Sequence, residues 1–256
     1  MGIQHRTLEG QTAIVTGSSN GIGTAIAHRL GEEGANVMIT GMNEERTKKV
    51  CEEVAEQHDV KSHYFLGDLS LEKNVMDMVE QTVDQLGNID ILVNNAGGGV
   101  ILPFLEHDAE TLKKTIDRNL WTVIWPCRYV LPHMVEQNYG RIIMVGADSV
   151  RNGLWQHAAY NAAKGGGHAL TTGLAREFAP YDITVNTIAP PAVEGEQYEN
   201  FKQKNPEMAQ KYIDIIPKGR AAKMEEVADA VWYLASERAS FITGQVISVN
   251  GGSTML

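Results

Sequence analysis

The sequence of 256 residues has few of the side chains that build disulfide frameworks or metal centres. Its two cysteines, Cys51 and Cys127, lie far apart, which excludes a disulfide scaffold and a cysteine-based zinc site and fits a reducing compartment. Residues 1–9 lack the apolar centre of a secretory signal, and no stretch contains eighteen consecutive apolar residues. We therefore expect a cytoplasmic protein with no metal ion and no membrane partner.

Positive charge is also scarce. Lys and Arg total 22 against 32 for Asp and Glu, which gives a formal net charge of -10, and no basic cluster interrupts this balance. Such a surface repels phosphate backbones and anionic lipids, so nucleic acid is excluded as a partner. The hydrophobic content of 43% and the charged content of 21% are ordinary for a folded protein. We expect one domain over residues 1–256.

Short apolar runs rich in β-branched residues alternate with helical patterns along the chain. The runs that predict strands are 12–16, 36–41, 63–66, 89–93, 141–145, 183–188 and 245–249. This alternation predicts an α/β fold, a single doubly wound, Rossmann-type domain with a seven-stranded parallel sheet flanked by helices. The irregular stretch of about 190–219 suggests a substrate lid, and a helical hairpin that only packs is the alternative.

Glycines gather directly after the first predicted strand, in Gly17-Ser18-Ser19-Asn20-Gly21-Ile22-Gly23. A tight turn needs positive φ, and backbone without side chains lets a ligand come close. The amides at the start of the next helix offer positive partial charge to an anion. The turn therefore suggests a pyrophosphate site, although glycine turns also serve as plain connectors.

The predicted helix over 158–179 carries Tyr160 and Lys164 four residues apart, on one face. A cation close to a phenol favours the phenolate and lowers its pKa from about 10. Tyr160 would then exchange protons near neutral pH. The simpler interpretation is an ordinary surface pair, and the spacing alone does not exclude it.

Taken together and in this order, the motifs resemble the short-chain dehydrogenase/reductase family over nearly the whole chain. The run 16–23 is similar to the family's cofactor turn, Asp68 to the acidic residue that holds the adenine amino group, and 94–97 (Asn-Asn-Ala-Gly) to the motif behind the fourth strand. Asn119, Tyr160 and Lys164 match three of the family's four catalytic residues.

This resemblance implies an NAD(P)-dependent oxidoreductase that interconverts a secondary alcohol and a ketone by hydride transfer. Tyr160 would be the acid/base, Lys164 would lower its pKa and bind the nicotinamide ribose, and Asn119 would anchor a water. Homodimers or homotetramers are also implied. The implied cofactor-binding residues are Gly17, Ser19, Asn20, Gly21, Ile22, Gly23, Asp68, Leu69, Asn95, Ala96, Gly97, Tyr160, Lys164, Pro190 and Val193.

The fourth catalytic residue of the family is a Ser, and Ala147 stands in its place. A lost donor of this kind typically costs on the order of a hundredfold in rate. Ser149 is the nearest replacement and would need a local turn to serve. The alternative function is a dinucleotide-binding regulatory protein with little turnover. Ala147, Ser149 and Trp155 are expected to line a site for an apolar or cyclic substrate, and 94–140 is similar to dehydrogenases that aromatise ring cis-dihydrodiols.

The choice between NAD and NADP depends on charges near the second strand. An acidic residue there selects the free ribose of NAD, and a basic one accommodates the phosphate of NADP. Gly41, Met42 and Asn20 carry neither charge. Arg46 on the following helix is within reach of a 2′-phosphate, which favours NADP slightly.

Overall fold

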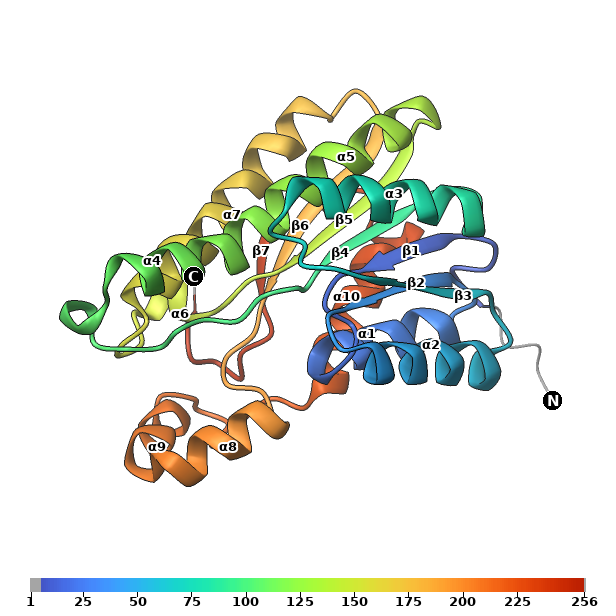
Figure 1. Cartoon of the computed structure of the whole chain (residues 1–256). Coiled ribbons are helices and arrows are strands. Elements are labelled where there is room, and N and C mark those ends of the chain that lie inside the picture. The colour runs from blue at the N-terminus through green and yellow to red at the C-terminus, as the bar shows by residue number, and fades with distance from the viewer. Residues whose placement is uncertain (1–5, 256) are drawn as a thin grey trace.

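The structure is a computed structural model that describes residues 6–255. One seven-stranded parallel sheet runs through its middle (Figure 1), in the order β3-β2-β1-β4-β5-β6-β7. The strands are β1 (Thr12–Val15), β2 (Asn36–Gly41), β3 (Ser62–Leu66), β4 (Ile91–Asn94), β5 (Tyr139–Val145), β6 (Asp182–Ala189) and β7 (Val246–Ser248). All seven predicted strands are present within two residues, and the predicted fold class is confirmed.

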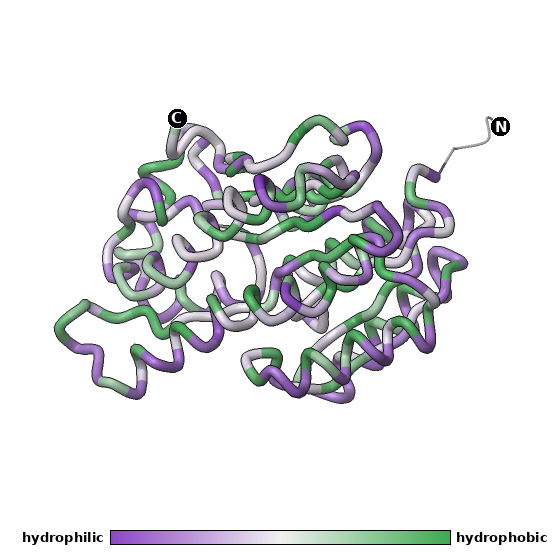
Figure 2. The backbone as a smooth tube through the Cα atoms, turned by 90° about the horizontal axis from the view of Figure 1, so that it is seen from above, coloured by the Kyte–Doolittle hydropathy of each residue, from purple (hydrophilic) through white to green (hydrophobic). Residues whose placement is uncertain are grey.

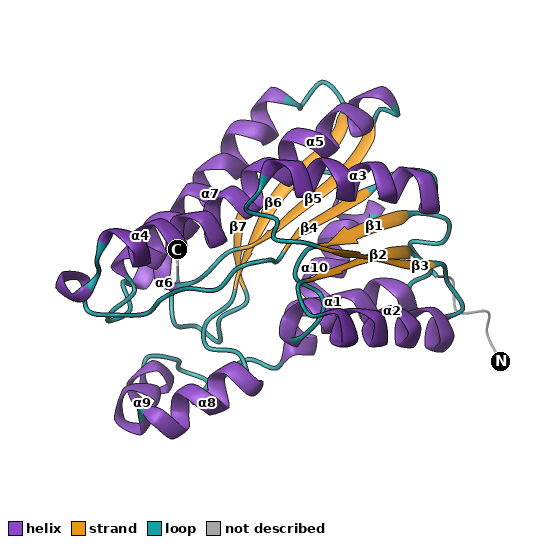
Figure 3. Cartoon of the chain, in the orientation of Figure 1, coloured by secondary structure: helices purple, strands orange, loops and turns teal. Residues whose placement is uncertain are grey.

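Helices cover both faces of the sheet (Figure 3). One face carries α1 (Gly21–Glu32), α2 (Glu44–His58) and α10 (Met224–Ala235), and the other carries α3 (Glu72–Leu86), α5 (Thr122–Glu136) and α7 (Ala158–Glu177). Successive residues of a strand point to opposite faces, so Ile14 belongs to one hydrophobic core and Val15 to the other. Hydrophobic and hydrophilic stretches alternate along the helices (Figure 2), as expected for helices with one buried face.

The order of the strands places a crevice in the middle of the sheet. β1 pairs with β2 on one side and β4 on the other, with Ala13 opposite both Val37 and Ile91. The chain therefore winds outward in both directions from this point. In open parallel sheets, ligands bind outside the carboxyl ends of the strands at such a switch of direction.

The shorter elements gather at that edge. They are the 3-10 turn η1 (Phe104–Glu106), α4 (Ala109–Ile116), the π-helical segment η2 (Asp117–Trp121), α6 (Ser149–Asn152), α8 (Glu196–Lys204) and α9 (Pro206–Asp214). The 3-10 turn η3 (Glu237–Ala239) lies at the opposite edge, between the end of α10 and the start of β7. The irregular region expected at 190–219 contains α8 and α9, which project from the body of the protein (Figure 1).

Two features are absent from residues 6–255. No helix there is both long enough and apolar enough to cross a bilayer. In the same part of the chain, no three His, Cys, Asp or Glu side chains come together in an arrangement that could hold a metal ion.

Candidate active site

The glycine turn after β1 packs against the loop after β4 too closely for side chains. A Cβ on Gly17 would lie 2.8 Å from Cα of Ala96, and a Cβ on Gly23 would lie 2.4 Å from the carbonyl oxygen of Gly17. Asn95 Nδ2 donates to that same carbonyl at 3.1 Å. Asn20 precedes α1 without capping it through its side chain, so the first amides of α1 can receive an anion. These residues fit a dinucleotide pyrophosphate.

The end of β2 has no room for a carboxylate. A Cβ on Gly41 would lie 2.3 Å from Thr47 Oγ1 and 2.7 Å from Ser19 Oγ. Arg46 lies nearby on α2 and lines a pocket of about 760 Å³ together with Ser19. Its guanidinium is 3.6 Å from the carboxylate of Glu196 on α8. The end of β2 therefore carries no charge at Gly41, and Arg46 is one of the cations, with Arg29 and Lys49, that line the adjoining pocket.

The other residues expected at the cofactor site lie at the same edge of the sheet. Asp68 and Leu69 follow β3. The Asp68 carboxylate is exposed and accepts the amide of Ser70 at 2.9 Å, while Leu69 is buried. Pro190 and Val193 follow β6 and lead into α8. The structure thus brings the predicted set together around the ends of β1, β3, β4 and β6.

Lys164 is the buried cation of this edge. It is 6% exposed, and its Nζ donates to the carbonyl oxygen of Val145, the last residue of β5, at 2.7 Å. Nζ lies 6.0 Å from the centre of the Tyr160 ring. A Cβ on Gly97 would be 3.3 Å from Nζ, and one on Gly99 would be 2.8 Å from the Tyr160 ring. Tyr160 and Lys164 share one face of α7, as predicted.

The predicted effect of Lys164 on the pKa of Tyr160 is not what the structure shows. Burial raises the pKa of Tyr160 to about 12 and lowers the pKa of Lys164 to about 8. Both shifts favour the neutral form, because desolvation penalises each charge and Nζ is bound to Val145 rather than to the phenol. The expectation of a lowered Tyr160 pKa is therefore wrong for the protein without ligand.

Asn119 lies in the π-helical segment η2 and is fully buried. Its Nδ2 donates to the carbonyl oxygens of Thr115 (2.9 Å) and Gly98 (3.0 Å), and its Oδ1 accepts the amide of Gly98 at 3.1 Å. A π-helical turn is often found at functional sites. Here it carries an amide that holds the loop after β4 in place next to Lys164.

The turn after β5 carries Ala147 and Ser149. The amide of Ala147 donates to Nε2 of His168 at 3.4 Å, and burial lowers the pKa of His168 to about 4, so this imidazole is a neutral acceptor. Ser149 opens α6, which supplies the local turn expected for it. Its hydroxyl donates to Oδ1 of Asn161 on α7 at 2.6 Å.

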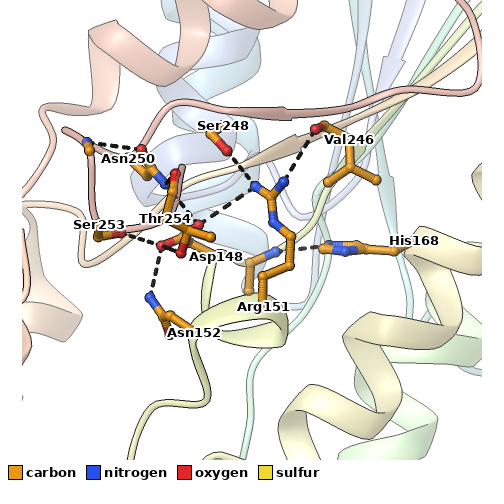
Figure 4. Close-up of polar contacts among 11 residues, drawn as sticks. Asp148, Arg151, Asn152, His168, Val246, Ser248, Asn250, Ser253 and Thr254 are labelled. Carbon is orange, nitrogen blue, oxygen red and sulfur yellow. Dashed lines mark hydrogen bonds and ion pairs between the residues drawn. The ribbon is translucent and has the colours of Figure 1, made fainter. Parts of the chain in front are cut away.

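A buried carboxylate between these two residues was missed by the sequence analysis (Figure 4). Asp148 has no exposed surface. It accepts from Asn152 (2.8 Å), Asn250 (2.9 Å), Thr254 (3.0 Å) and the hydroxyl of Ser253. The C-terminal segment 250–254 therefore fixes the turn that carries Ala147 and Ser149. The long separation along the chain left no local signal for it.

A pocket of about 520 Å³ opens beside this turn. Its lining comes from the loop after β4, the turn after β5, α7 and α9, and comprises Pro103, Phe104, Gly153, Leu154, Trp155, Gln156, Ala158, Asn161 and Met208. Trp155 lines this pocket, whereas Ala147 and Ser149, which were also expected to line the substrate site, are not among its lining residues. Most of the lining is apolar, as in many small-molecule sites.

Aromatic rings link α9 to α7, the helix that carries Tyr160. The His157 ring meets the rings of Tyr160 and Tyr212 edge-on, with centroids 5.6 Å and 5.5 Å away. Tyr212 also stacks on Phe201 of α8 at 5.3 Å. The projecting helices thus reach the pocket through a chain of rings that ends at Tyr160.

Replacing Lys164 with Met removes the buried amine and tests its pKa of about 8. Between that value and 10.5, the folded protein has released a proton that the unfolded chain still holds, so the free energy of unfolding rises with pH. We expect wild type to gain up to about 3 kcal/mol relative to K164M across this range, from roughly 1.4 kcal/mol per pKa unit. Urea unfolding of both proteins at several pH values measures this, and a flat difference contradicts it.

Comparison with known proteins identifies the family. A family model described as enoyl-(acyl carrier protein) reductase matches residues 17–254. A 2,3-dihydroxy-2,3-dihydro-p-cumate dehydrogenase of Pseudomonas putida is 56% identical over 249 residues, which cover 97% of this chain and 96% of that protein. A 3-oxoacyl-(acyl-carrier-protein) reductase of Aquifex aeolicus is 38% identical over 245 residues, with 96% and 98% covered.

Comparison with solved structures points to the same family. An NAD+-bound xylitol dehydrogenase superposes with a TM-score of 0.90 at 31% identity and covers 96% of this chain and 99% of its own. The predicted resemblance is confirmed, and the relatives favour an enzyme over a regulatory protein that only binds a dinucleotide. The chain belongs to the short-chain dehydrogenase/reductase family and is an NAD(P)-dependent oxidoreductase that acts on CH–OH groups.

Proposed function

We propose that this enzyme oxidises a vicinal diol on a dearomatised ring to the corresponding catechol. The observation that carries the proposal is the largely apolar pocket of about 520 Å³ that Trp155 and Met208 line together with Asn161, the residue that follows Tyr160 on α7. A flat ring fits such a lining, while the diol needs polar partners from α7. The 56% identity to a dehydrogenase of a ring dihydrodiol supports the same substrate class.

In this proposal, Tyr160 takes the proton of one hydroxyl group. When bound, the oxidised nicotinamide accepts the hydrogen of the same carbon as a hydride. The resulting ketone tautomerises: the neighbouring carbon that carries the second hydroxyl loses its proton to water and the ketone oxygen gains a proton, so one diol gives one catechol, one reduced cofactor and one proton. The phenolate that Tyr160 needs is disfavoured in the free protein, where burial raises its pKa to about 12. Alcohol oxidation should therefore become faster as the pH rises.

We also propose roles for the neighbouring residues. Lys164 would bind the nicotinamide ribose, and Asn119 would hold the loop after β4 and a water that leads from Lys164 to solvent. The sequence predicts Ser149 as the substitute for the hydroxyl that Ala147 lacks, but the Ser149 hydroxyl donates to Oδ1 of Asn161, so we propose that it acts through that amide. The cofactor would lie on Gly17, Ser19, Asn20, Gly21, Ile22, Gly23, Asp68, Leu69, Asn95, Ala96, Gly97, Tyr160, Lys164, Pro190 and Val193.

The chain would act as one catalytic domain, with α8 and α9 as its lid over about 190–219. The contact of Met208 with the pocket and the stacked rings of Phe201 and Tyr212 support this role for the lid. A cytoplasmic location and assembly into homodimers or homotetramers remain predictions.

Replacing Tyr160 with Phe tests the function directly. Purified wild type is mixed with NAD or NADP and a panel of ring cis-dihydrodiols, and the near-ultraviolet absorbance of the reduced cofactor is followed. We expect turnover by wild type and a loss on the order of a thousandfold in Y160F, because general acid/base catalysis contributes on that scale. Equal rates for the two proteins would contradict the role of Tyr160, and no turnover of any diol by wild type would contradict the substrate class.

The proposed contact between Arg46 and the 2′-phosphate of NADP can be tested by measuring cofactor binding. The absence of a carboxylate at Gly41 and the guanidinium of Arg46 in the adjoining pocket support binding of NADP, with a slight preference over NAD. Changing Arg46 to Ala should weaken NADPH binding roughly fivefold to tenfold and leave NADH unchanged, since only NADPH carries the phosphate that Arg46 would contact. Fluorescence titration with both cofactors measures this.

Two control variants show whether the effect on NADPH binding is specific to Arg46. Lys49 lines the same pocket but is 3.8 Å from Glu53, so Lys49→Ala should change neither affinity appreciably. Glu196→Gln releases Arg46 from its carboxylate partner and should tighten NADPH binding. Equal weakening of both cofactors in R46A would contradict a phosphate contact.

A further inference from the structure

We propose that Asn161 is the hydrogen-bond donor that holds a substrate oxygen in the apolar pocket, and that Ser149 fixes the orientation of its amide. The inference deepens the proposed function and rests on it for the identity of the substrate. It also answers what replaces the hydroxyl that Ala147 lacks.

The amide of Asn161 has one end engaged and one end free. Ser149 is 4% exposed, and its hydroxyl donates to Asn161 Oδ1 at 2.6 Å. With its oxygen held in this way, the amide directs Nδ2 and its two N–H groups away from Ser149. Within residues 6–255, the side-chain hydrogen bond of Asn161 is the one that its oxygen accepts, and Nδ2 donates to no protein group. The side chain nevertheless lines the pocket.

The apolar lining of the pocket suggests that the free N–H groups of Asn161 bind a ligand. The walls next to Asn161 are formed by Phe104, Leu154, Trp155 and Met208. Once a ring displaces water from such a pocket, an N–H group without a partner is costly, whereas a substrate oxygen satisfies it. Small-molecule sites commonly combine an apolar lining with a few such polar groups, which set the orientation of the ligand.

The position of Asn161 suits a substrate with two neighbouring oxygens. It directly follows Tyr160 on α7, so the two side chains leave the helix about 100° apart. A ring diol between them would present one oxygen to the phenol and its neighbour to Nδ2. Ala147 carries a methyl group and is buried, so it offers no donor from its side chain. Asn161 therefore supplies from α7 what the turn after β5 does not.

One residue that lines the pocket also has an unusual backbone conformation. Gln156, another lining residue, has φ of 64°, which is uncommon for a residue with a side chain. Such conformations persist only where the surrounding structure enforces them, and they are frequent at ligand sites. The carbonyl oxygen of the preceding Trp155 accepts from the Tyr212 hydroxyl at 3.3 Å. The rim that faces Asn161 is thus tied to α9.

The test uses three variants of the full chain: Asn161→Leu, which keeps the size but removes the N–H groups, Ser149→Ala, and the double variant. The kcat/KM for a ring cis-dihydrodiol is compared with that for an alcohol of the same ring with one hydroxyl group. We expect a loss of about tenfold in N161L and about threefold in S149A for the diol. The double variant should be no worse than N161L, because Ser149 acts through Asn161.

Binding of a catechol gives a readout that does not depend on turnover. Calorimetric titration of the enzyme saturated with reduced cofactor should show catechol binding that is about tenfold weaker in N161L. Affinity for the reduced cofactor alone should stay the same. Asn161→Asp, which exchanges the donor for an acceptor in the same shape, should show the same loss and guards against a folding defect in N161L.

Several outcomes would overturn the inference: wild-type kcat/KM and catechol affinity in N161L, a loss in S149A that adds fully to that of N161L, or no catechol binding by wild type. The additive result would make Ser149 itself the donor. If wild type turns over no diol but binds catechol through Asn161, the proposed function fails and this inference stands. If wild type and N161L turn over the diol at equal rates, the proposed function stands and this inference fails.

Discussion

The hydrogen bond from Lys164 to the last carbonyl of β5 is the constraint on which the site depends. It places a buried amine at the carboxyl end of the sheet and fixes the rotation of α7 against β5. Because residues four apart share a helix face, the same rotation presents Tyr160 next to the loop after β4. The close approach of Gly97 and Gly99 follows, since a Cβ on Gly97 would lie 2.9 Å from Asn119 Oδ1 and one on Gly99 would lie 2.8 Å from the Tyr160 ring. The proposed cofactor site and the proposed acid/base Tyr160 are thereby joined through one helix.

A second group of contacts stabilises the opposite wall of the site. Asp148 collects hydrogen bonds from the C-terminal segment, and its amide donates to the carbonyl of Pro190 at 2.9 Å. The segment in turn reaches the chain that follows α9, where the backbone amide of Lys218 donates to the carbonyl oxygen of Gly251 at 3.2 Å. The turn after β5, the end of the 190–219 region and the C-terminal segment therefore form one connected unit. The Asp148 carboxylate accepts several hydrogen bonds at once, and such a buried network favours a single arrangement of the residues it holds.

Much of this could be predicted from the sequence, because the signals are local. Buried parallel strands are short apolar runs, glycine spacing marks the turn before α1, and the spacing of Tyr160 and Lys164 marks a shared face. The shifted pKa of Tyr160 could not be predicted, since it depends on burial by packing rather than on the charge four residues away. The partners of Asp148 lie 102 to 106 residues along the chain, and the free amide of Asn161 is visible only once Ser149 is seen to hold its oxygen.

The central claim is that Tyr160 removes a hydroxyl proton while the hydrogen on the same carbon passes to nicotinamide in the crevice beside Lys164. The most direct test uses a ring cis-dihydrodiol with deuterium on its two diol carbons. Mass spectrometry of the reduced cofactor should show one deuterium per turnover, and the rate constant of a single turnover should fall severalfold relative to the unlabelled diol. Catechol formation with no deuterium in the cofactor would contradict the account.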